Sequence, residues 1–214
     1  VSPGLVGGVL SSQNLIMPLL IMMIIMMSGG TVISSMALEK ENKTLETLLT
    51  MPVRRGSIVT GKIVGSALVG LVFAAIYMLG FGYYMNSFQT SAQIDLAAYG
   101  LTLGLGDYLL LGLSVFITIL AALALCILMG AFAKNYKSAQ TLTMPLVVLA
   151  LVPFFVTMFK DFQTLPIIAQ VGLFLIPFSH PMMAMNNLMF DSYLMVIGGI
   201  AYTTIFAVIC VVAA

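Results

Sequence analysis

Residues 38–62 read LEKENKTLETLLTMPVRRGSIVTGK and divide two long apolar stretches from one another. This segment holds eight of the fifteen charged residues of the 214-residue chain, so we expect it to lie in water beside a membrane. As a helix, it places four leucines near one another: Leu38, Leu45, Leu48 and Leu49. Glu39 and Lys43 form an i, i+4 pair on a different face, and Pro52 ends the helix because it lacks an amide donor. The pattern predicts an amphipathic helix that docks on another protein, with an ordinary solvated loop as the alternative.

The composition is that of an integral membrane protein. Apolar residues make up 61% of the chain and charged residues 7%, and the mean hydropathy is +1.15. Soluble domains carry about 25% charged residues, which excludes a single water-soluble core. The two cysteines, Cys126 and Cys210, lie in apolar runs, where they are packing residues rather than a disulfide or metal site. The net charge of +1 gives no indication of a nucleic-acid partner.

Five apolar stretches are long enough to span a bilayer core, which takes about 20 helical residues. They are 14–37, 63–85, 108–132, 139–159 and 192–213, and none contains a Lys, Arg, Asp or Glu. A sixth stretch, 165–177, has 13 residues with prolines near its start and at its end, which is too short to span. Residues 165–190 are therefore predicted to form a re-entrant hairpin. The predicted fold is an all-α polytopic membrane protein with five transmembrane helices in one domain, 1–214.

The basic residues set the orientation of these spans. Seven of the eight fall between spans one and two or between spans three and four, which the positive-inside rule assigns to the cytoplasm. The N-terminus is then outside, the C-terminus inside and the 165–190 hairpin at the outer surface. Because the chain starts outside without an initiator Met or a signal sequence, we expect a further span upstream of it.

Three apparent chemical motifs carry little weight. The run GSIVTGKI at 56–63 lacks the hydroxyl residue and the preceding strand of a phosphate-binding P-loop. The sequence Gly104-Leu105-Gly106-Asp107 resembles the GxGD signature of intramembrane aspartyl proteases, but no second carboxylate lies within a span, and Asp107 is predicted instead to be the N-cap of the 108–132 helix. His180, the only histidine, excludes a multi-histidine metal site and is expected to be a loop or gate contact.

Two short sequences resemble the signature of type-2 ABC exporter permeases, including sodium-exporter-like members. One is Thr44-Leu45-Glu46-Thr47-Leu48-Leu49 with Pro52 and the Gly61-Lys62 pair, and the other is Ile176-Pro177-Phe178-Ser179-His180-Pro181 before the last span. The resemblance covers nearly the whole chain, which is expected to begin after the family's first span and extracytoplasmic region. It implies that 38–50 is a cytoplasmic coupling helix that docks on a separate ATP-binding subunit.

The resemblance also implies site residues and partners. The interface with the ATP-binding subunit would be formed by Glu39, Glu41, Leu45, Glu46, Leu48, Leu49, Arg54 and Arg55, and an outer gate by Pro177, His180 and Pro181. ATP and magnesium would be bound by the partner subunit, with no cofactor on this chain. A second permease copy or homologous half would complete the transporter in the cytoplasmic membrane of a prokaryote. The alternatives are a protease-like enzyme that uses Asp107, and a membrane scaffold subunit.

Overall fold

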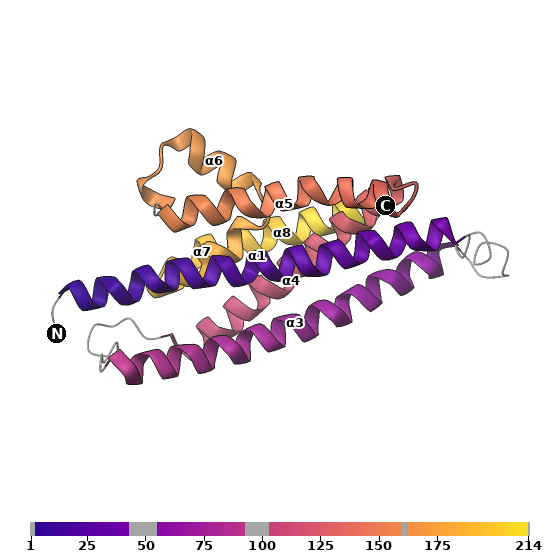
Figure 1. Ribbon diagram of the computed structural model, residues 1–214. Coiled ribbons are helices and arrows are strands. Elements are labelled where there is room, and N and C mark those ends of the chain that lie inside the picture. Colours follow the sequence, from indigo (N-terminus) through magenta and orange to yellow (C-terminus); the bar gives the residue numbers. More distant parts are fainter. Residues whose placement is uncertain (1–2, 43–54, 93–102, 160–161, 214) are drawn as a thin grey trace.

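The computed structural model describes residues 3–42, 55–92, 103–159 and 162–213, and in these ranges it contains helices and no strands (Figure 1). The helices are α1 (Pro3–Glu41), α3 (Arg55–Ala92), α4 (Leu105–Phe132), α5 (Tyr136–Phe159), α6 (Ile167–Leu175), α7 (Ser179–Met189) and α8 (Tyr193–Ala213), with a 3-10 turn at Phe162–Thr164. The prediction of an all-α polytopic membrane protein is confirmed.

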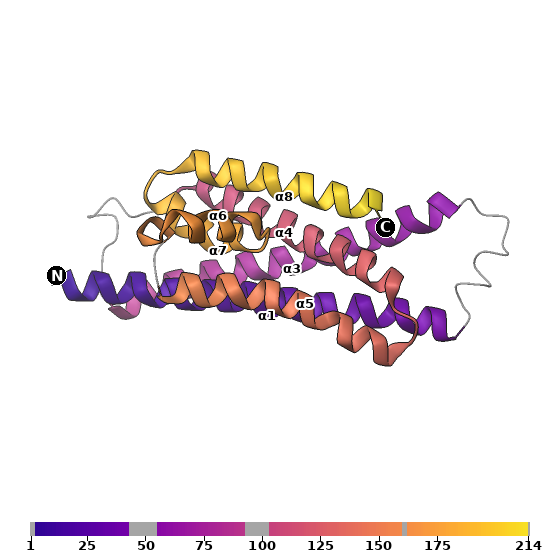
Figure 2. The ribbon, with the colours of Figure 1, turned by 90° about the horizontal axis from the view of Figure 1, so that it is seen from above.

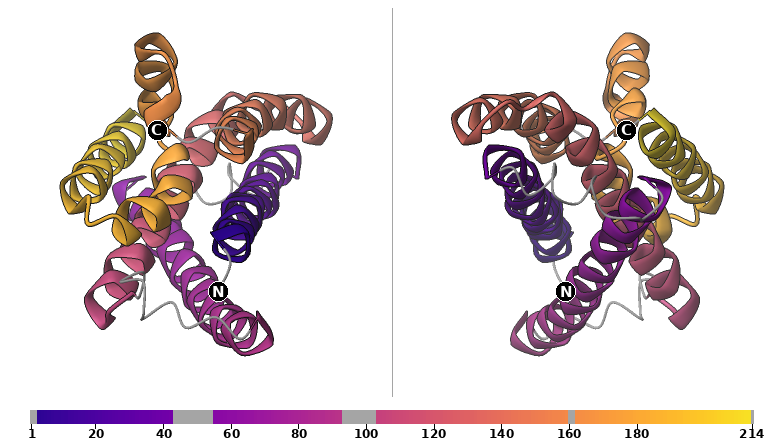
Figure 3. Two further views of the ribbon diagram at one scale, coloured as in Figure 1. Left: turned by 90° about the vertical axis from the view of Figure 1, so that its left-hand side faces the viewer. Right: turned by 90° about the vertical axis from the view of Figure 1, so that its right-hand side faces the viewer.

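The long helices lie side by side and the chain reverses direction at both ends of the bundle (Figures 1 and 2). Helix α4 is at the centre and packs against α1, α3, α7 and α8. Viewed along the bundle, α8 lies on one side of α4 and α1 with α5 on the other (Figure 3). The C-terminus lies at the end where α1 finishes and α3 begins (Figure 1).

Helix α1 packs through one face. Its buried residues recur every four residues at Ile21, Ile25, Gly29, Ile33 and Ala37, which is close to the period of a helical stripe. Gly29, on the same stripe, touches α4 and α5, since a Cβ there would lie 2.3 Å from Leu146 Cδ2 and 2.9 Å from Cys126 Sγ. A larger residue at this position would force the side chains of Leu146 and Cys126 to shift.

Small residues let the neighbours of α4 approach it closely. Ala121, Ala122 and Ala124 are buried. A Cβ added to Gly130 would lie 2.8 Å from the sulfur of Met36 in α1. In lipid, the hydrophobic effect does not drive helices together. Small residues of this kind stabilise helix association instead, because they allow dense van der Waals packing. Helix α4 consequently has twelve buried residues.

Among the residues that the structure describes, four helices are long and apolar enough to cross a membrane: Pro18–Glu41, Leu105–Phe132, Tyr136–Phe159 and Tyr193–Ala213. Helix α3 contains a shorter apolar helical stretch, Leu68–Tyr84. Helices α6 and α7 meet at a bend of 117°, which is the form of a re-entrant loop or of one broken span. The re-entrant hairpin at 165–190 therefore stays a prediction.

Helical structure extends into both ends of the predicted coupling segment. Helix α1 continues through residues 38–41 to Glu41, so these residues do not start a separate amphipathic helix, and 55–62 are the first residues of α3. The cytoplasmic position of 38–62 stays a prediction. Apolar composition shows where a helix prefers hydrocarbon, but helical hydrogen bonding continues into water until a cap or a breaker ends it. The remainder of the predicted coupling helix, 43–54, lies outside the described residues.

Candidate functional site

The predicted ATPase-interface residues fall into three groups. Glu39 and Glu41 lie in the last turn of α1, and Arg55 is the first residue of α3. Leu45, Glu46, Leu48, Leu49 and Arg54 lie outside the described residues. The structure thus brings the two ends of the predicted coupling segment to one end of the bundle (Figure 1). The contact of this segment with another subunit stays a prediction.

Lys40 joins the end of α1 to the end of α4. Its Nζ donates to the carbonyl oxygens of Gly130 at 3.3 Å and Ala133 at 3.1 Å, and to that of Ala131. The last carbonyl groups of a helix have no partner in the helix and carry the negative end of its dipole, so an ammonium group is well suited to them. Lys40 is a functional candidate that the sequence analysis did not single out, and no local signal points to a contact 90 residues away.

Glu41 makes the complementary contact with α5. Its Oε2 accepts a hydrogen bond of 3.0 Å from the backbone N–H of Tyr136, the first residue of α5. Asn135 precedes that helix, and its Oδ1 accepts a bond of 2.9 Å from the backbone N–H of Ser138. A carboxylate at the positive end of a helix dipole is stabilising. Together Lys40 and Glu41 hold the turn between α4 and α5 to the end of α1, and we call this pair the α1 clamp.

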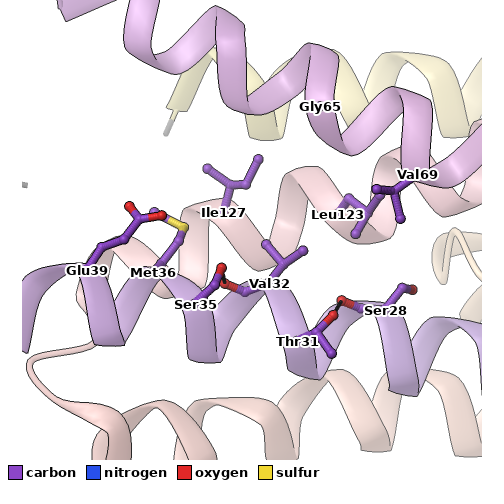
Figure 4. A pocket seen from close by; sticks show the side chains of 10 residues that line it. All are labelled: Ser28, Thr31, Val32, Ser35, Met36, Glu39, Gly65, Val69, Leu123 and Ile127. Carbon is purple, nitrogen blue, oxygen red and sulfur yellow. Dashed lines mark hydrogen bonds between the residues drawn. The ribbon is translucent and has the colours of Figure 1, made fainter. Parts of the chain in front are cut away.

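A cavity of about 360 Å³ opens between α1, α3 and α4 beside this clamp (Figure 4). Its α1 wall carries Ser28, Thr31, Val32, Ser35, Met36 and Glu39, and its other walls are Gly65 and Val69 of α3 and Leu123 and Ile127 of α4. The polar residues recur along one helix, with Glu39 at the end of the row nearest the clamp (Figure 4). The cavity thus has a polar strip along α1 that faces apolar side chains.

The hydroxyl groups of this strip donate to their own helix. Ser28 Oγ lies 2.5 Å from Ile24 O, Thr31 Oγ1 2.8 Å from Ser28 O, and Ser35 Oγ 2.9 Å from Val32 O. Each hydroxyl has one proton and two lone pairs, so a hydroxyl whose proton is engaged offers an acceptor to its surroundings. The sequence shows the helical spacing of Ser28, Thr31 and Ser35, but only the structure shows that they line one cavity.

The predicted outer-gate residues are buried at the bend between α6 and α7. Pro177, His180 and Pro181 are all buried, and His180 is 6% exposed. The Nε2 of His180 lies 3.1 Å from the carbonyl oxygen of Phe174, so this nitrogen carries the proton in that hydrogen bond. A Cβ at Gly199 of α8 would lie 2.8 Å from His180 Nδ1. His180 is therefore packed in place, and a gating role for it stays a prediction.

Side chains satisfy the last carbonyl groups of α6. Ser179 Oγ lies 2.7 Å from the carbonyl oxygens of both Leu173 and Ile176, and the hydroxyl of Tyr202 in α8 donates to Leu175 O at 2.7 Å. With His180 on Phe174 O, every carbonyl from 173 to 176 has a side-chain partner nearby. These hydrogen bonds are stabilising, because a carbonyl group without a partner in lipid costs several kcal/mol of free energy.

Asp107 has a structural role at the start of α4. The predicted N-cap assignment is wrong, because α4 begins at Leu105 and Gly104 is its N-cap. Asp107 is the third helical residue, and its Oδ2 accepts a hydrogen bond of 2.7 Å from the N–H of Gly104. The phenol of Tyr193 interacts with the carboxylates of Asp107 and Asp191, which joins the start of α8 to the start of α4.

Helices that span a membrane, a bent helix pair and charged residues gathered at the helix ends define a polytopic α-helical membrane protein. Residues 7–214 match the family described as ABC-2 family transporter protein, and the chain belongs to this family. It is 30% identical over 174 residues to the ABC transporter permease protein NatB of Bacillus subtilis (strain 168), an alignment that covers 76% of this chain and 41% of the relative. The chain thus spans about two fifths of the length of that relative. No solved structure matches the chain.

Proposed function

We propose that the chain is the membrane-spanning permease subunit of an ATP-driven exporter, which moves a substrate across the cytoplasmic membrane of a prokaryote. The observation that carries this proposal is the family match over 7–214, nearly the whole chain. A similar protein, NatB, is named an ABC transporter permease. The resemblance of 38–62 to exporter permeases supports the exporter direction and the prokaryotic membrane.

The energy would come from a separate subunit. ATP and magnesium are bound by that ATP-binding partner, which docks on 38–62, and a second permease copy or homologous half completes the complex. The segment is suited to this contact because it holds most of the charge of the chain and joins α1 to α3 at one end of the bundle (Figure 1). The permease itself performs no chemistry in this scheme.

The α1 clamp supplies a route for the motion. ATP-driven closure of the partner pushes on the docking segment and therefore on the ends of α1 and α3. Lys40 and Glu41 bind the end of α1 to the backbone of α4 and α5, so the displacement reaches those helices without passing through the membrane interior. Closely packed helices move as units because dense packing does not deform continuously.

The test is purification of the full-length protein from native membranes in mild detergent, with identification of the subunits that accompany it. We expect a stoichiometric ATPase, and we expect the Glu46→Gln/Leu48→Ala variant to lose it. The matched control is Asp191→Asn, a charge loss at the opposite end of the bundle that keeps a residue tolerant of the local φ of 54°. A preparation without ATPase, or one that keeps the ATPase in the docking variant, would contradict the proposal.

A further inference from the structure

The turn between α4 and α5 lies at the end of the bundle where α1 finishes (Figure 2). Two basic and two aromatic side chains are exposed there: Phe132, Lys134, Tyr136 and Lys137. In the part of the chain that the structure describes, neither lysine ammonium group makes a hydrogen bond or an ion pair. We call residues 132–137 the basic turn.

The lengths of the two helices place the basic turn at the level of the lipid head groups. Helix α4 has 28 residues and is therefore about 42 Å long, which matches the roughly 40–45 Å of a bilayer with its head groups. Helix α5 begins at Tyr136, so that only residues 133–135 lie between two helices able to span the membrane. A connection this short cannot extend far into the water, and its side chains therefore meet the membrane surface.

This end of the bundle is positive overall. Residues 39–62 and 134–137 hold seven basic and three acidic residues, a net charge of +4, whereas the five other charged residues of the chain carry −3. The charges between the end of α1 at Glu41 and the start of α3 at Arg55 are tethered to this end. The net charge does not depend on which way individual side chains point. A lipid leaflet at this end therefore faces a positive surface.

The backbone amides of the turn already have acceptors. The N–H of Tyr136 donates to Glu41, and those of Lys134 and Asn135 donate to Ser138 Oγ at 2.9 and 3.1 Å. The N–H of Ser138 donates to Asn135 Oδ1 at 2.9 Å. A helix N-terminus binds anions through amides that have no other partner. An anionic group at this turn would consequently be bound by the lysine side chains.

We propose that the basic turn binds the head group of an anionic phospholipid. The ammonium groups of Lys134 and Lys137 contact the head group, and the rings of Phe132 and Tyr136 lie in the interface beside it. Lysine at the membrane surface attracts anionic lipids, and aromatic rings prefer this depth. The interaction would hold the α4–α5 turn, and with it the α1 clamp, at the membrane surface. This binding goes beyond the proposed transporter function and does not depend on it.

The test uses a fluorophore at the turn. The chain contains no tryptophan, so Phe132→Trp introduces one at a position that is 72% exposed. The full-length protein is placed in nanodiscs of equal parts phosphatidylglycerol and phosphatidylcholine, without the ATP-binding subunit. One of the two lipids carries bromine, which quenches nearby tryptophan, and the signal is the difference from the protein without the substitution. We expect brominated phosphatidylglycerol to quench more strongly than brominated phosphatidylcholine.

Phe190→Trp is the matched control for position. Phe190 is 60% exposed and precedes Asp191, whose carboxylate interacts with Tyr193 together with that of Asp107 at the start of α4. This is the other end of the bundle, where acidic residues predominate. We expect no preference for phosphatidylglycerol at Phe190→Trp.

Charge variants of the Phe132→Trp protein test the two lysines. Lys134→Gln and Lys137→Gln are each expected to lower the preference for phosphatidylglycerol about fivefold, the usual contribution of one lysine at an anionic surface. The double variant Lys134→Arg/Lys137→Arg keeps both charges and is expected to keep the preference. Because both positions are exposed, we expect all these variants to have equal melting temperatures.

The outcomes separate the lipid site from the proposed function. Equal quenching of Phe132→Trp by the two lipids, or a preference that survives Lys134→Gln/Lys137→Gln, overturns the lipid site. Equal quenching together with loss of a copurifying ATPase in that double variant would make the turn a contact of the ATP-binding subunit instead. A preference for phosphatidylglycerol in a protein that copurifies with no ATPase supports the lipid site and contradicts the transporter proposal.

Discussion

Two adjacent side chains of opposite charge end α1, and each contacts a helix end whose dipole it complements. Lys40 is directed to the carbonyl groups that close α4, and Glu41 to the first N–H of α5. Both partners are backbone groups, which cannot turn away as a side chain can. Of these three consecutive charged residues, Glu39 therefore lines the cavity, whereas Lys40 and Glu41 form the α1 clamp.

Replacement of Lys40 by Met tests the clamp. Met keeps most of the length and the apolar stem of lysine but cannot donate to the carbonyl groups of α4. We expect the protein to lose about 1–2 kcal/mol of stability, the range for a charge-assisted hydrogen bond that is partly exposed and for a cation at a helix C-terminus. The measurement is thermal unfolding of the full-length protein in detergent.

The control for this prediction is Lys137→Met, the same change at an exposed position on α5. If the clamp also carries the motion of the docking segment, Lys40→Met retains ATP hydrolysis by the partner but transports less substrate. Equal melting temperatures for the two variants would show that Lys40 contributes nothing beyond surface charge.

At the element scale, the bend between α6 and α7 depends on donors from outside α6. Leu175 O receives its hydrogen bond from Tyr202 in α8, 27 residues away, while Ser179 and His180 serve the neighbouring carbonyl groups. Rings also pack there, with His180 4.8 Å from Phe174 and 5.3 Å from Tyr202 between centroids. This bent pair is thus held to α8 by hydrogen bonds and ring contacts together.

Tyr202→Phe removes the one donor to Leu175 O and keeps the ring contacts. We expect faster amide hydrogen exchange in the peptide that covers the bend, and a stability loss of about 0.5–1.5 kcal/mol, because the bend loses one hydrogen bond to α8. Tyr83→Phe is the control, since Tyr83 is 80% exposed on α3. Unchanged exchange at the bend in Tyr202→Phe would mean that the hydrogen bond does not hold it.

The sequence predicted the helices far better than it predicted their ends and contacts. Apolar stretches located α4, α5 and α8 to within a few residues because hydrocarbon length fixes how long such a run must be. The sequence did not show that α1 continues unbroken to Glu41 or that α3 begins at Arg55, because polar residues such as Glu39 and Lys40 are good helix formers that carry no hydropathy signal. The role of Lys40 depends on α4, and no sequence period reports a contact between distant segments.

At the scale of the whole molecule, the helices on either side of the docking segment are joined to the bundle differently. Helix α1 packs on α4, α5 and α7, and α8 packs on α4 and α7. The extensive contacts of α3 among the described residues are with α4, and the cavity separates α3 from α1. A push on the segment between α1 and α3 would therefore move α3 against the rest and change the width of the cavity.

The orientation of the bundle can be tested by labelling single cysteines. The background is Cys126→Ala/Cys210→Ala in the full-length protein, since both native cysteines are buried. Lys134→Cys lies on the exposed turn between α4 and α5, and Gly104→Cys lies on the exposed start of α4, at an ordinary φ of −78°. A membrane-impermeant maleimide is applied to intact cells and, separately, to permeabilised cells.

We expect Gly104→Cys to react in intact cells and Lys134→Cys only after permeabilisation. The physical reason is that seven of the eight basic residues fall within 40–62 or 134–137 of the sequence, between the predicted spans, and Lys and Arg are retained on the cytoplasmic side during insertion. The opposite labelling pattern would place the docking segment and the mouth of the cavity outside the cell, where no ATP-driven partner could reach them. That result would contradict the proposed coupling together with the orientation.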